Sequence, residues 1–240
     1  MNKIALITGA TAGIGEATAY LLAKNGFDLI LTGRRKDRLE NIASKIRKDG
    51  AKGITLDFDI RNQDETEQAV SELPGAWTSI DVLINNAGLA VGLNPIDKGV
   101  IEDWERMIDT NIKGLLYITR AVSPGMVKRK SGHIINISSI AGKEVYPNGN
   151  VYAATKHAVD ALSKAMRIDL VSHGIKVSNI GPGMVDTEFS VVRFKGDKKK
   201  ADDVYKGFQP LLAEDIAEAV LFALSRPKHV TINDLLIMPT

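Results

Sequence analysis

The 240-residue sequence contains no cysteine, which excludes disulfide bonds, thiolate nucleophiles and the commonest structural zinc ligands. It also lacks any apolar run near the ~20 residues that span a bilayer. The N-terminus enters an apolar segment too short for a signal-peptide core, so we expect a cytoplasmic protein with no membrane partner. The histidines are scattered and predict no metal site; they are His133, His157, His173 and His229.

The chain also lacks a large excess of positive or negative charge. The chain has 31 basic and 29 acidic residues and a net charge of +2, which gives no support for nucleic acid as a partner. The basic run Lys198–Lys200 is followed by Asp202 and Asp203, a pattern typical of a solvated loop. The length suits one large α/β domain over residues 1–240 and is short for two.

Short apolar segments alternate with longer helical patterns along the whole chain. The segments lack polar alternation, which is typical of strands buried on both faces. This order predicts a doubly wound, mostly parallel sheet of about seven strands with helices on both faces. One irregular region, residues 184–209, is long enough to be a substrate lid. The predicted strands are Lys3–Thr8, Asp28–Thr32, Gly53–Phe58, Val82–Asn85, His133–Ser138, Lys176–Ile180 and Leu235–Met238.

A glycine-rich turn follows the first predicted strand. Gly9, Gly13 and Gly15 precede a helical stretch that runs from Glu16 to Asn25. Glycine lets the backbone approach a pyrophosphate closely, and the helix N-terminus offers free N–H groups. The turn therefore predicts a dinucleotide site of the Rossmann type.

Two arginines, Arg34 and Arg35, end the second predicted strand, where NAD-binding enzymes usually carry an acidic residue for the ribose 2′-hydroxyl. Guanidinium groups without a neighbouring carboxylate favour a 2′-phosphate, which arginine binds through paired hydrogen bonds. The alternative is a pair of solvated side chains at a helix start, where a positive charge gains nothing from the helix dipole. We therefore predict NADP(H) as the cofactor.

Tyr152 and Lys156 are four residues apart on a predicted helix, so both side chains lie on one face. A tyrosine that exchanges protons at neutral pH needs its phenolate stabilised by ~3–4 kcal/mol, which a neighbouring lysine and an oxidised nicotinamide can supply. Polar residues also end the fourth and fifth strands, at the edge where parallel sheets bind ligands. Asn111 lies in an otherwise apolar helical stretch and needs a partner.

Together these motifs resemble the short-chain dehydrogenase/reductase family in its compact single-domain form, over essentially the whole chain. The matching elements, in order, are Thr8-Gly9-x3-Gly13-x-Gly15, Asp59, Asn85-Asn86-Ala87-Gly88, Asn111, Ser139, Tyr152-x3-Lys156 and Pro182-Gly183-x3-Thr187.

The resemblance implies Tyr152 as general acid/base, with Lys156 lowering its pKa and binding the nicotinamide ribose. It assigns Ser139 to the substrate oxygen and Asn111 to a water-mediated proton relay. Ser138 is the rival serine, but in an extended strand only one of the two hydroxyls faces the site. The predicted cofactor-binding residues are Gly9, Thr11, Ala12, Gly13, Ile14, Gly15, Arg34, Arg35, Asp59, Ile60, Asn86, Ala87, Gly88, Tyr152, Lys156, Pro182, Gly183, Val185 and Thr187.

Within the family, the chain resembles the bacterial NADP-dependent 3-hydroxy acid dehydrogenases that act on serine, allo-threonine and 3-hydroxypropionate. The similarity lies in residues 88–90, 103–104, 107–111 and 187–197, the last inside the predicted lid. A small 3-hydroxy acid carries a carboxylate, for which Arg193 or Lys195 can supply the counter-charge. Both cations can equally be solvated loop residues.

The alternatives are a 3-oxoacyl-carrier-protein reductase or broad carbonyl reductase, and a non-catalytic NADP-binding regulator. A regulator is disfavoured because such proteins are expected to lose the tyrosine or the lysine, and this chain keeps both. The resemblance also implies a homotetramer that associates through two long helices, at about Ile101–Lys128 and Val151–His173.

Overall fold

One seven-stranded sheet forms the centre of the molecule, in the computed structural model that describes residues 2–240. Its strand order is β3-β2-β1-β4-β5-β6-β7, and every neighbouring pair is parallel. The predicted doubly wound fold is therefore confirmed. The strands are β1 (Lys3–Ile7), β2 (Phe27–Gly33), β3 (Gly53–Asp57), β4 (Val82–Asn85), β5 (Gly132–Ile137), β6 (Ile175–Pro182) and β7 (Asp234–Ile237).

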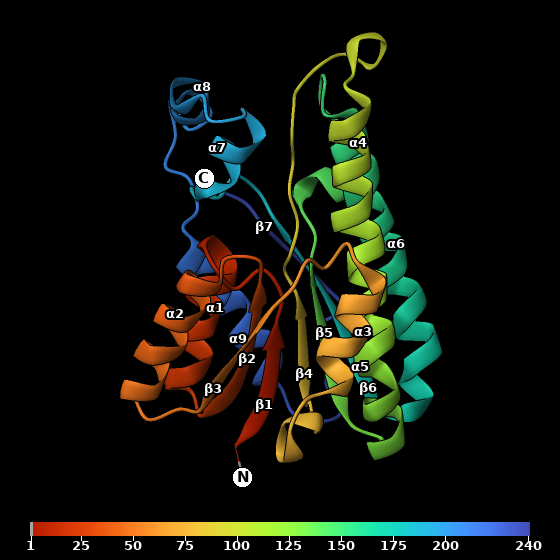
Figure 1. Cartoon of the computed structure of the whole chain (residues 1–240). Helices are drawn as coiled ribbons and strands as arrows, with labels where there is room; N and C mark the ends of the chain where they lie inside the picture. The colour runs from red at the N-terminus through yellow and green to blue at the C-terminus, as the bar shows by residue number, and fades with distance from the viewer. Residues whose placement is uncertain (1) are drawn as a thin grey trace.

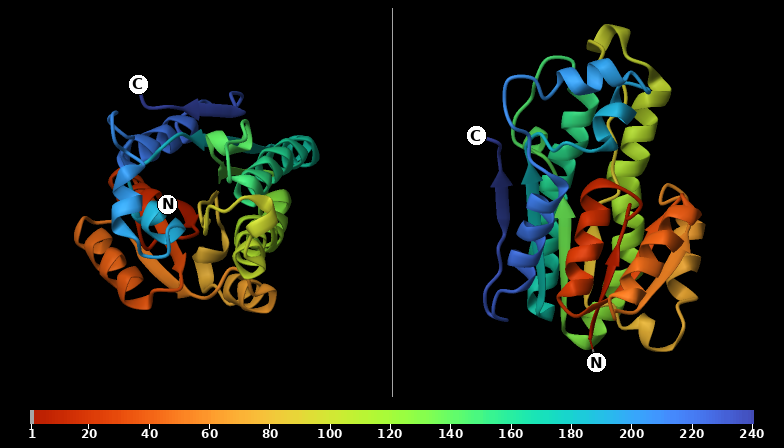
Figure 2. Two further views of the ribbon diagram at one scale, coloured as in Figure 1. Left: turned by 90° about the horizontal axis from the view of Figure 1, so that it is seen from above. Right: turned by 90° about the vertical axis from the view of Figure 1, so that its left-hand side faces the viewer.

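The central strands are apolar along their whole length because helices cover both faces of the sheet. In β1, Ala5 and Ile7 pack into the core on one face, whereas Ile4 and Leu6 pack into the core on the other. Each fully buried Leu or Ile side chain stabilises the folded state by about 1.5–3 kcal/mol. Because both faces of the strand are buried, a polar side chain at any of these positions would lie in the apolar core. Strand β7 lies at an outer edge (Figure 2), and its side chains are more exposed.

Two groups of helices cover the sheet. Helices α1, α2 and α9 pack on one face, and α3, α5 and α6 pack on the other (Figure 1). In Figure 1 the strand arrowheads point toward the end of the molecule that carries α7 and α8. The helices are α1 (Gly13–Lys24), α2 (Lys36–Lys48), α3 (Gln63–Ser71), α4 (Ile101–Ile108), α5 (Leu115–Arg129), α6 (Asn150–Leu170), α7 (Glu188–Arg193), α8 (Lys198–Asp203) and α9 (Ala213–Leu224).

The helix expected over Ile101–Lys128 is not continuous. A π-helical turn, Asp109–Gly114, separates α4 from α5. Such a turn contains one residue more than an α-helical turn, so the side chains that follow it are rotated about the helix axis. Turns of this kind occur frequently at functional sites. It buries Asn111, and it brings the backbone of Gly114 against Ile60, where an added Cβ would lie 3.0 Å from the isoleucine Cγ2.

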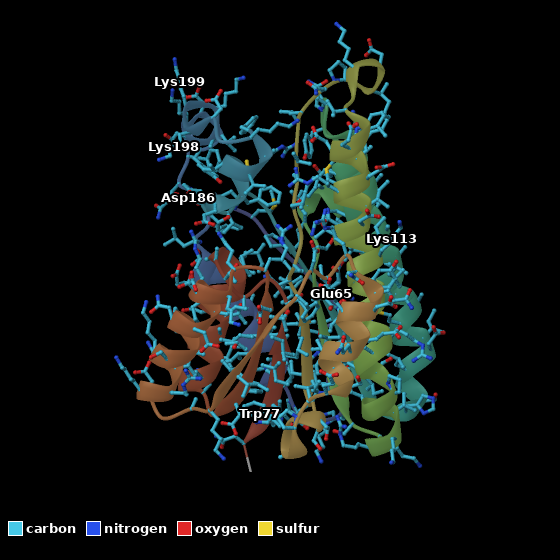
Figure 3. The ribbon with its side chains drawn as sticks, in the orientation of Figure 1. Glu65, Trp77, Lys113, Asp186, Lys198 and Lys199 are labelled. Carbon is cyan, nitrogen blue, oxygen red and sulfur yellow. The ribbon has the colours of Figure 1, made fainter. Side chains whose placement is uncertain are left out.

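Residues 184–209 contain two short helices, where the sequence indicated an irregular loop. Thr187 caps α7 by accepting a hydrogen bond from the Phe189 N–H, and Asp197 caps α8 in the same way from Lys200. The basic run at 198–200 therefore forms the first turn of α8, and the prediction of a loop there was wrong. Figure 3 shows Lys198 and Lys199 at the outer end of the molecule. Among residues 2–240, no helix is long and apolar enough to cross a membrane.

His133 on β5 is 7% exposed, and its Nε2 lies 2.8 Å from the Ser178 hydroxyl. Burial lowers the pKa of His133 from 6.5 to about 3, and the charges of Lys176 and Lys3 act in the same direction. The folded state therefore holds the neutral imidazole, while the unfolded chain takes up a proton below pH 6.5.

The free energy of unfolding should consequently be highest above pH 6.5 and fall as the pH is lowered toward 3. For this one group the loss between pH 7 and pH 5 is about 2 kcal/mol. Urea unfolding of the wild type and of His133→Asn at pH 7 and pH 5 measures this loss. Between the two pH values the free energy of unfolding should fall by about 2 kcal/mol less in the variant than in the wild type. His229→Asn, at an exposed position, should keep the wild-type difference; an equal pH dependence in all three proteins would contradict the assignment.

Candidate active site

A cleft of about 390 Å³ opens at the carboxyl ends of the strands. It lies where the strand order reverses between β1 and β4, the position at which doubly wound sheets bind ligands. Most of the predicted site residues line it, whereas Gly15, Asn111 and Arg193 are not part of its wall. The predicted residues in the wall are Gly9, Thr11, Ala12, Gly13, Ile14, Arg34, Arg35, Asp59, Ile60, Asn86, Ala87, Gly88, Ser139, Tyr152, Lys156, Pro182, Gly183, Val185 and Thr187.

The glycine turn has a backbone that other residues cannot adopt without strain. Gly9 and Gly13 have φ values of 65° and 55°, in the left-handed region. At Gly15 the constraint is space, because an added Cβ would lie 2.4 Å from the Gly9 carbonyl oxygen and 2.5 Å from Asn86 Nδ2. Gly15 therefore acts by letting the turn close behind the cleft.

Asn86 ties the end of β4 to this turn. Its side-chain amide donates to the carbonyl oxygens of Thr8 (2.9 Å) and Gly9 (3.2 Å). The Thr8 hydroxyl in turn accepts from the backbone N–H groups of Asn86 and Ala87 and donates to the Ile84 carbonyl. These bonds hold the two loops on either side of the cleft at a fixed separation.

The arginine corner of the cleft contains a carboxylate that the sequence did not indicate. Arg35 donates to the Thr11 hydroxyl through Nε and Nη2, and its Nη1 donates to Glu188 at 2.8 Å. Arg38 holds the other Glu188 oxygen at 2.8 Å. The neighbouring Arg34 lies 3.7 Å from Asp59. The expectation of arginines without a carboxylate was therefore wrong.

Asp59, predicted beside the adenine, is held by a bidentate pair with Arg61. The Arg61 Nη2 lies 2.6 Å from one carboxylate oxygen, and its Nε lies 3.0 Å from both oxygens. Hydrogen bonds from Arg61 outweigh partial burial and lower the pKa of Asp59. The ionised carboxylate is thus fixed at the wall of the cleft.

Tyr152, Ser139 and Lys156 meet at the other end of the cleft. Ser139 is extended and follows β5, and its hydroxyl accepts a hydrogen bond from the Ala141 N–H. Ser138 points the other way and donates to the Lys156 carbonyl of α6. The Lys156 ammonium donates to the Ile137 carbonyl at 3.0 Å and lies 5.9 Å from the centre of the Tyr152 ring.

Burial acts on both ionisable groups of this pair. It raises the pKa of Tyr152, because the phenolate is desolvated; the Ser139 hydrogen bond and the charge of Arg193 act against this, and Tyr146 adds to it. Burial also lowers the pKa of Lys156 to about 8. The direction at Tyr152 is opposite to the one that the sequence analysis required.

Both the oxygen and the nitrogen of the Asn111 amide form hydrogen bonds with neighbouring residues. Its Oδ1 accepts from the Leu89 N–H, and its Nδ2 donates to the Leu89 carbonyl and the Thr155 hydroxyl. Thr155 is on α6 between Tyr152 and Lys156. Asn111 therefore joins the π-helical turn to the helix that carries this pair.

Arg193, at the end of α7, lies beside Tyr152 but outside the wall of the cleft. Its guanidinium carbon lies 5.6 Å from the centre of the Tyr152 ring and 5.2 Å from that of Tyr146, and its Nη2 donates to the Tyr146 hydroxyl at 2.7 Å. The buried Nε has no hydrogen-bond partner among residues 2–240. Lys195, the other predicted counter-charge, is held 2.7 Å from Asp103 of α4.

The residues of this site that were missed from the sequence include Arg38, Tyr146 and Glu188. Glu188 meets Arg35 across more than 150 positions of chain, so no local pattern could pair them. Tyr146 follows a three-residue 3-10 turn after β5 and carries no motif of its own. Residues 2–240 contain no group of three or more His, Asp or Glu side chains arranged to hold a metal ion.

Comparison with known proteins gives consistent matches. The short chain dehydrogenase family model matches residues 3–198. The chain is 50% identical to the NADP-dependent 3-hydroxy acid dehydrogenase YdfG of Salmonella typhi over 98% of this chain and 94% of that protein. It is 44% identical to serine 3-dehydrogenase of Agrobacterium fabrum over 100% and 94%. The closed form of serine dehydrogenase complexed with NADP+ superposes with a TM-score of 0.93, at 48% identity, over 97% of this chain and 93% of that one.

The residues of the cleft fit NADP(H). The glycine turn gives a close backbone approach for the pyrophosphate, and the corner beside β2 already holds an anionic group between two guanidinium groups. These observations and the NADP-dependent relatives identify NADP(H) as the cofactor.

The fit makes Gly15 a test position. A Gly15→Ala methyl group would meet the Gly9 carbonyl, so the turn must open and NADPH should bind at least about tenfold more weakly, or ~1.4 kcal/mol. Gly53→Ala is the matched control, because its nearest contact would be an ordinary 3.8 Å. Fluorescence titration with NADPH, with thermal midpoints to verify folding, measures both; unchanged affinity in Gly15→Ala would show that the turn does not form the cofactor site.

Proposed function

Because the chain belongs to the short-chain dehydrogenase family and is an NADP-dependent oxidoreductase, we propose that it interconverts a small 3-hydroxy acid and its 3-oxo acid. The substrates proposed are of the L-serine, L-allo-threonine and 3-hydroxypropionate type. The observation that carries this proposal is the Arg193 guanidinium beside Tyr152, with one N–H buried and unpaired among the described residues. The chain's similarity to an NADP-dependent 3-hydroxy acid dehydrogenase and to a serine 3-dehydrogenase supports the proposal.

In the proposed reaction, Tyr152 moves the proton at the substrate oxygen. Bound NADP(H) supplies the hydride donor or acceptor. In the reducing direction the Tyr152 hydroxyl protonates the developing alkoxide, while the Ser139 hydroxyl, which lines the same cleft, donates a hydrogen bond to the same oxygen. Lys156 binds the nicotinamide ribose, and Asn111 supports the proton relay by holding α6 against the π-helical turn.

Two cations of the protein favour the phenolate of Tyr152. Lys156 and Arg193 lie 5.9 Å and 5.6 Å from the ring centre, on elements that are far apart in the sequence. Burial opposes them and strengthens every charge interaction in the site. The proposal therefore requires that the positive charge of the oxidised nicotinamide and closure of residues 184–209 complete the stabilisation.

Arg193 is proposed to bind the substrate carboxylate. An arginine N–H without a partner costs free energy when buried, and a carboxylate oxygen is the acceptor that matches it. The Tyr146 hydroxyl accepts a hydrogen bond from Nη2 of the same guanidinium and leaves Nε available for a substrate oxygen. Lys195 is already paired with Asp103, which favours Arg193 of the two predicted cations.

Tyr152→Phe tests the proton transfer. It keeps the ring volume in the buried site but removes the hydroxyl, so turnover should fall by about 10²–10⁴-fold or more while NADPH binding stays nearly unchanged. Tyr117→Phe on α5 is the matched control and should retain activity. Substantial turnover in Tyr152→Phe would contradict the assigned role, and no NADP-linked turnover of any alcohol by the wild type would favour a non-catalytic regulator.

Arg193→Met tests the substrate class. Loss of a charge-assisted hydrogen bond of about 1.5–3 kcal/mol should raise the KM for L-serine or 3-hydroxypropionate by about 10–100-fold, with a much smaller effect on neutral alcohols. Lys199→Met, at an exposed position of the same segment, is the control and should change the KM for both kinds of substrate little. An equal loss for acids and neutral alcohols would show that Arg193 only packs residues 184–209. Wild-type activity confined to neutral substrates would favour a carbonyl or 3-oxoacyl-carrier-protein reductase.

We also propose a cytoplasmic homotetramer. Ile101, Ile108 and Leu116 are exposed along α4 and α5, and Ile168 and Val171 are exposed at the end of α6, on the two long helical segments predicted to associate. Burying these side chains between subunits removes apolar surface from water. Sedimentation analysis gives the number of subunits.

A further inference from the structure

The Glu188 carboxylate lies in an arrangement typical of a bound anion. Each oxygen accepts a hydrogen bond at 2.8 Å from a different guanidinium group, one from Arg35 and the other from Arg38. Arg35 is oriented further by its two bonds to the Thr11 hydroxyl. Glu188 is the first residue of α7, so this contact also joins residues 184–209 to the start of α2.

The same corner is where the 2′-phosphate of NADP(H) has to bind. It follows β2, beside the glycine turn, and Arg34, Arg35 and Glu188 all line the cleft there. A phosphate at this point and the Glu188 carboxylate require the same N–H donors. Two anions on one pair of guanidinium groups repel each other, and a phosphate carries about two negative charges at neutral pH.

We infer that Glu188 is a specificity-determining residue that competes with the 2′-phosphate of NADP(H) for Arg35 and Arg38. NADP(H) binds by taking these donors from Glu188, which then moves into solvent. NAD(H) has only a hydroxyl at this position and leaves Glu188 in place. The inference rests on the NADP dependence of the chain and not on the identity of its hydroxy acid.

The solvent exposure of the three side chains limits how strongly Glu188 can compete with the phosphate. The side chains of Arg35, Arg38 and Glu188 are 44%, 48% and 49% exposed, so water screens the ion pairs. The arginines lower the pKa of Glu188, which is consequently ionised throughout the neutral range. We therefore expect a change of about 3–10-fold in the affinity of phosphate-bearing ligands when the carboxylate is neutralised.

The experiment uses two nucleotide fragments that share the adenosine but differ at the 2′ position. Adenosine 2′,5′-bisphosphate carries the 2′-phosphate, and adenosine 5′-monophosphate does not. Calorimetric titration of Glu188→Gln should show about 3–10-fold tighter binding of the first fragment and unchanged binding of the second. Glu188→Ala should behave in the same way, and the NADH-to-NADPH ratio of dissociation constants should rise accordingly.

Asp186→Asn is the matched control. Asp186 is exposed in the same segment (Figure 3), and its substitution makes the same change in charge two residues away. It should leave both fragments unchanged. A gain in Asp186→Asn equal to that in Glu188→Gln would replace competition by a general field effect and overturn the inference.

Two further outcomes distinguish this inference from the assignment of the phosphate corner itself. If Arg35→Gln weakens binding of the bisphosphate while Glu188→Gln leaves it unchanged or weakens it, the corner binds phosphate but Glu188 does not compete. If Arg35→Gln has no effect on either fragment, the corner itself is misassigned and the inference is overturned with it. Equal tightening of both fragments in Glu188→Gln would show an effect of mobility in residues 184–209, not of charge.

Discussion

The hydrogen bonds that join the end of β4 to the glycine turn after β1 are the constraint on which the rest of the site depends. At this point neighbouring strands lead to loops on opposite sides of the sheet, and without a cross-connection the cleft between them would have no fixed width. Thr8 and Asn86 supply the connection through one hydroxyl and one amide. Gly15 supplies the space, because any side chain there would displace the Asn86 amide.

Helix α7 links the two ends of the cleft. Its first residue contacts the arginines beside β2, and its last residue contacts Tyr146 and lies over Tyr152. Figure 1 shows α7 above the carboxyl ends of the strands. A further bond from the Gly92 N–H to the Arg193 carbonyl holds the end of this helix to the loop after β4. A six-residue helix thus contacts both the proposed phosphate corner and the proposed substrate end.

Burial of the Tyr152–Lys156 pair has opposite consequences for its two members. It disfavours the phenolate of Tyr152 and the ammonium of Lys156, so each is driven toward its neutral form. The same low-dielectric surroundings strengthen the attraction between either charged form and a partner of opposite sign.

The sequence by itself determined the fold class, the family, the cofactor and most of the cleft wall. The apolar strands and the glycine turn can be recognised from the local sequence pattern. The order of the motifs along the chain identifies the family and its cofactor. Periodicity did not reveal the π-helical turn at Asn111, because one inserted residue hardly changes an apolar pattern. Only the tertiary structure decided which charges meet: Glu188 with Arg35, Lys195 with Asp103, and Arg193 with Tyr146. These pairs are brought together by the packing of residues 184–209 over the sheet edge, and long-range packing leaves no trace in the spacing of residues along the chain.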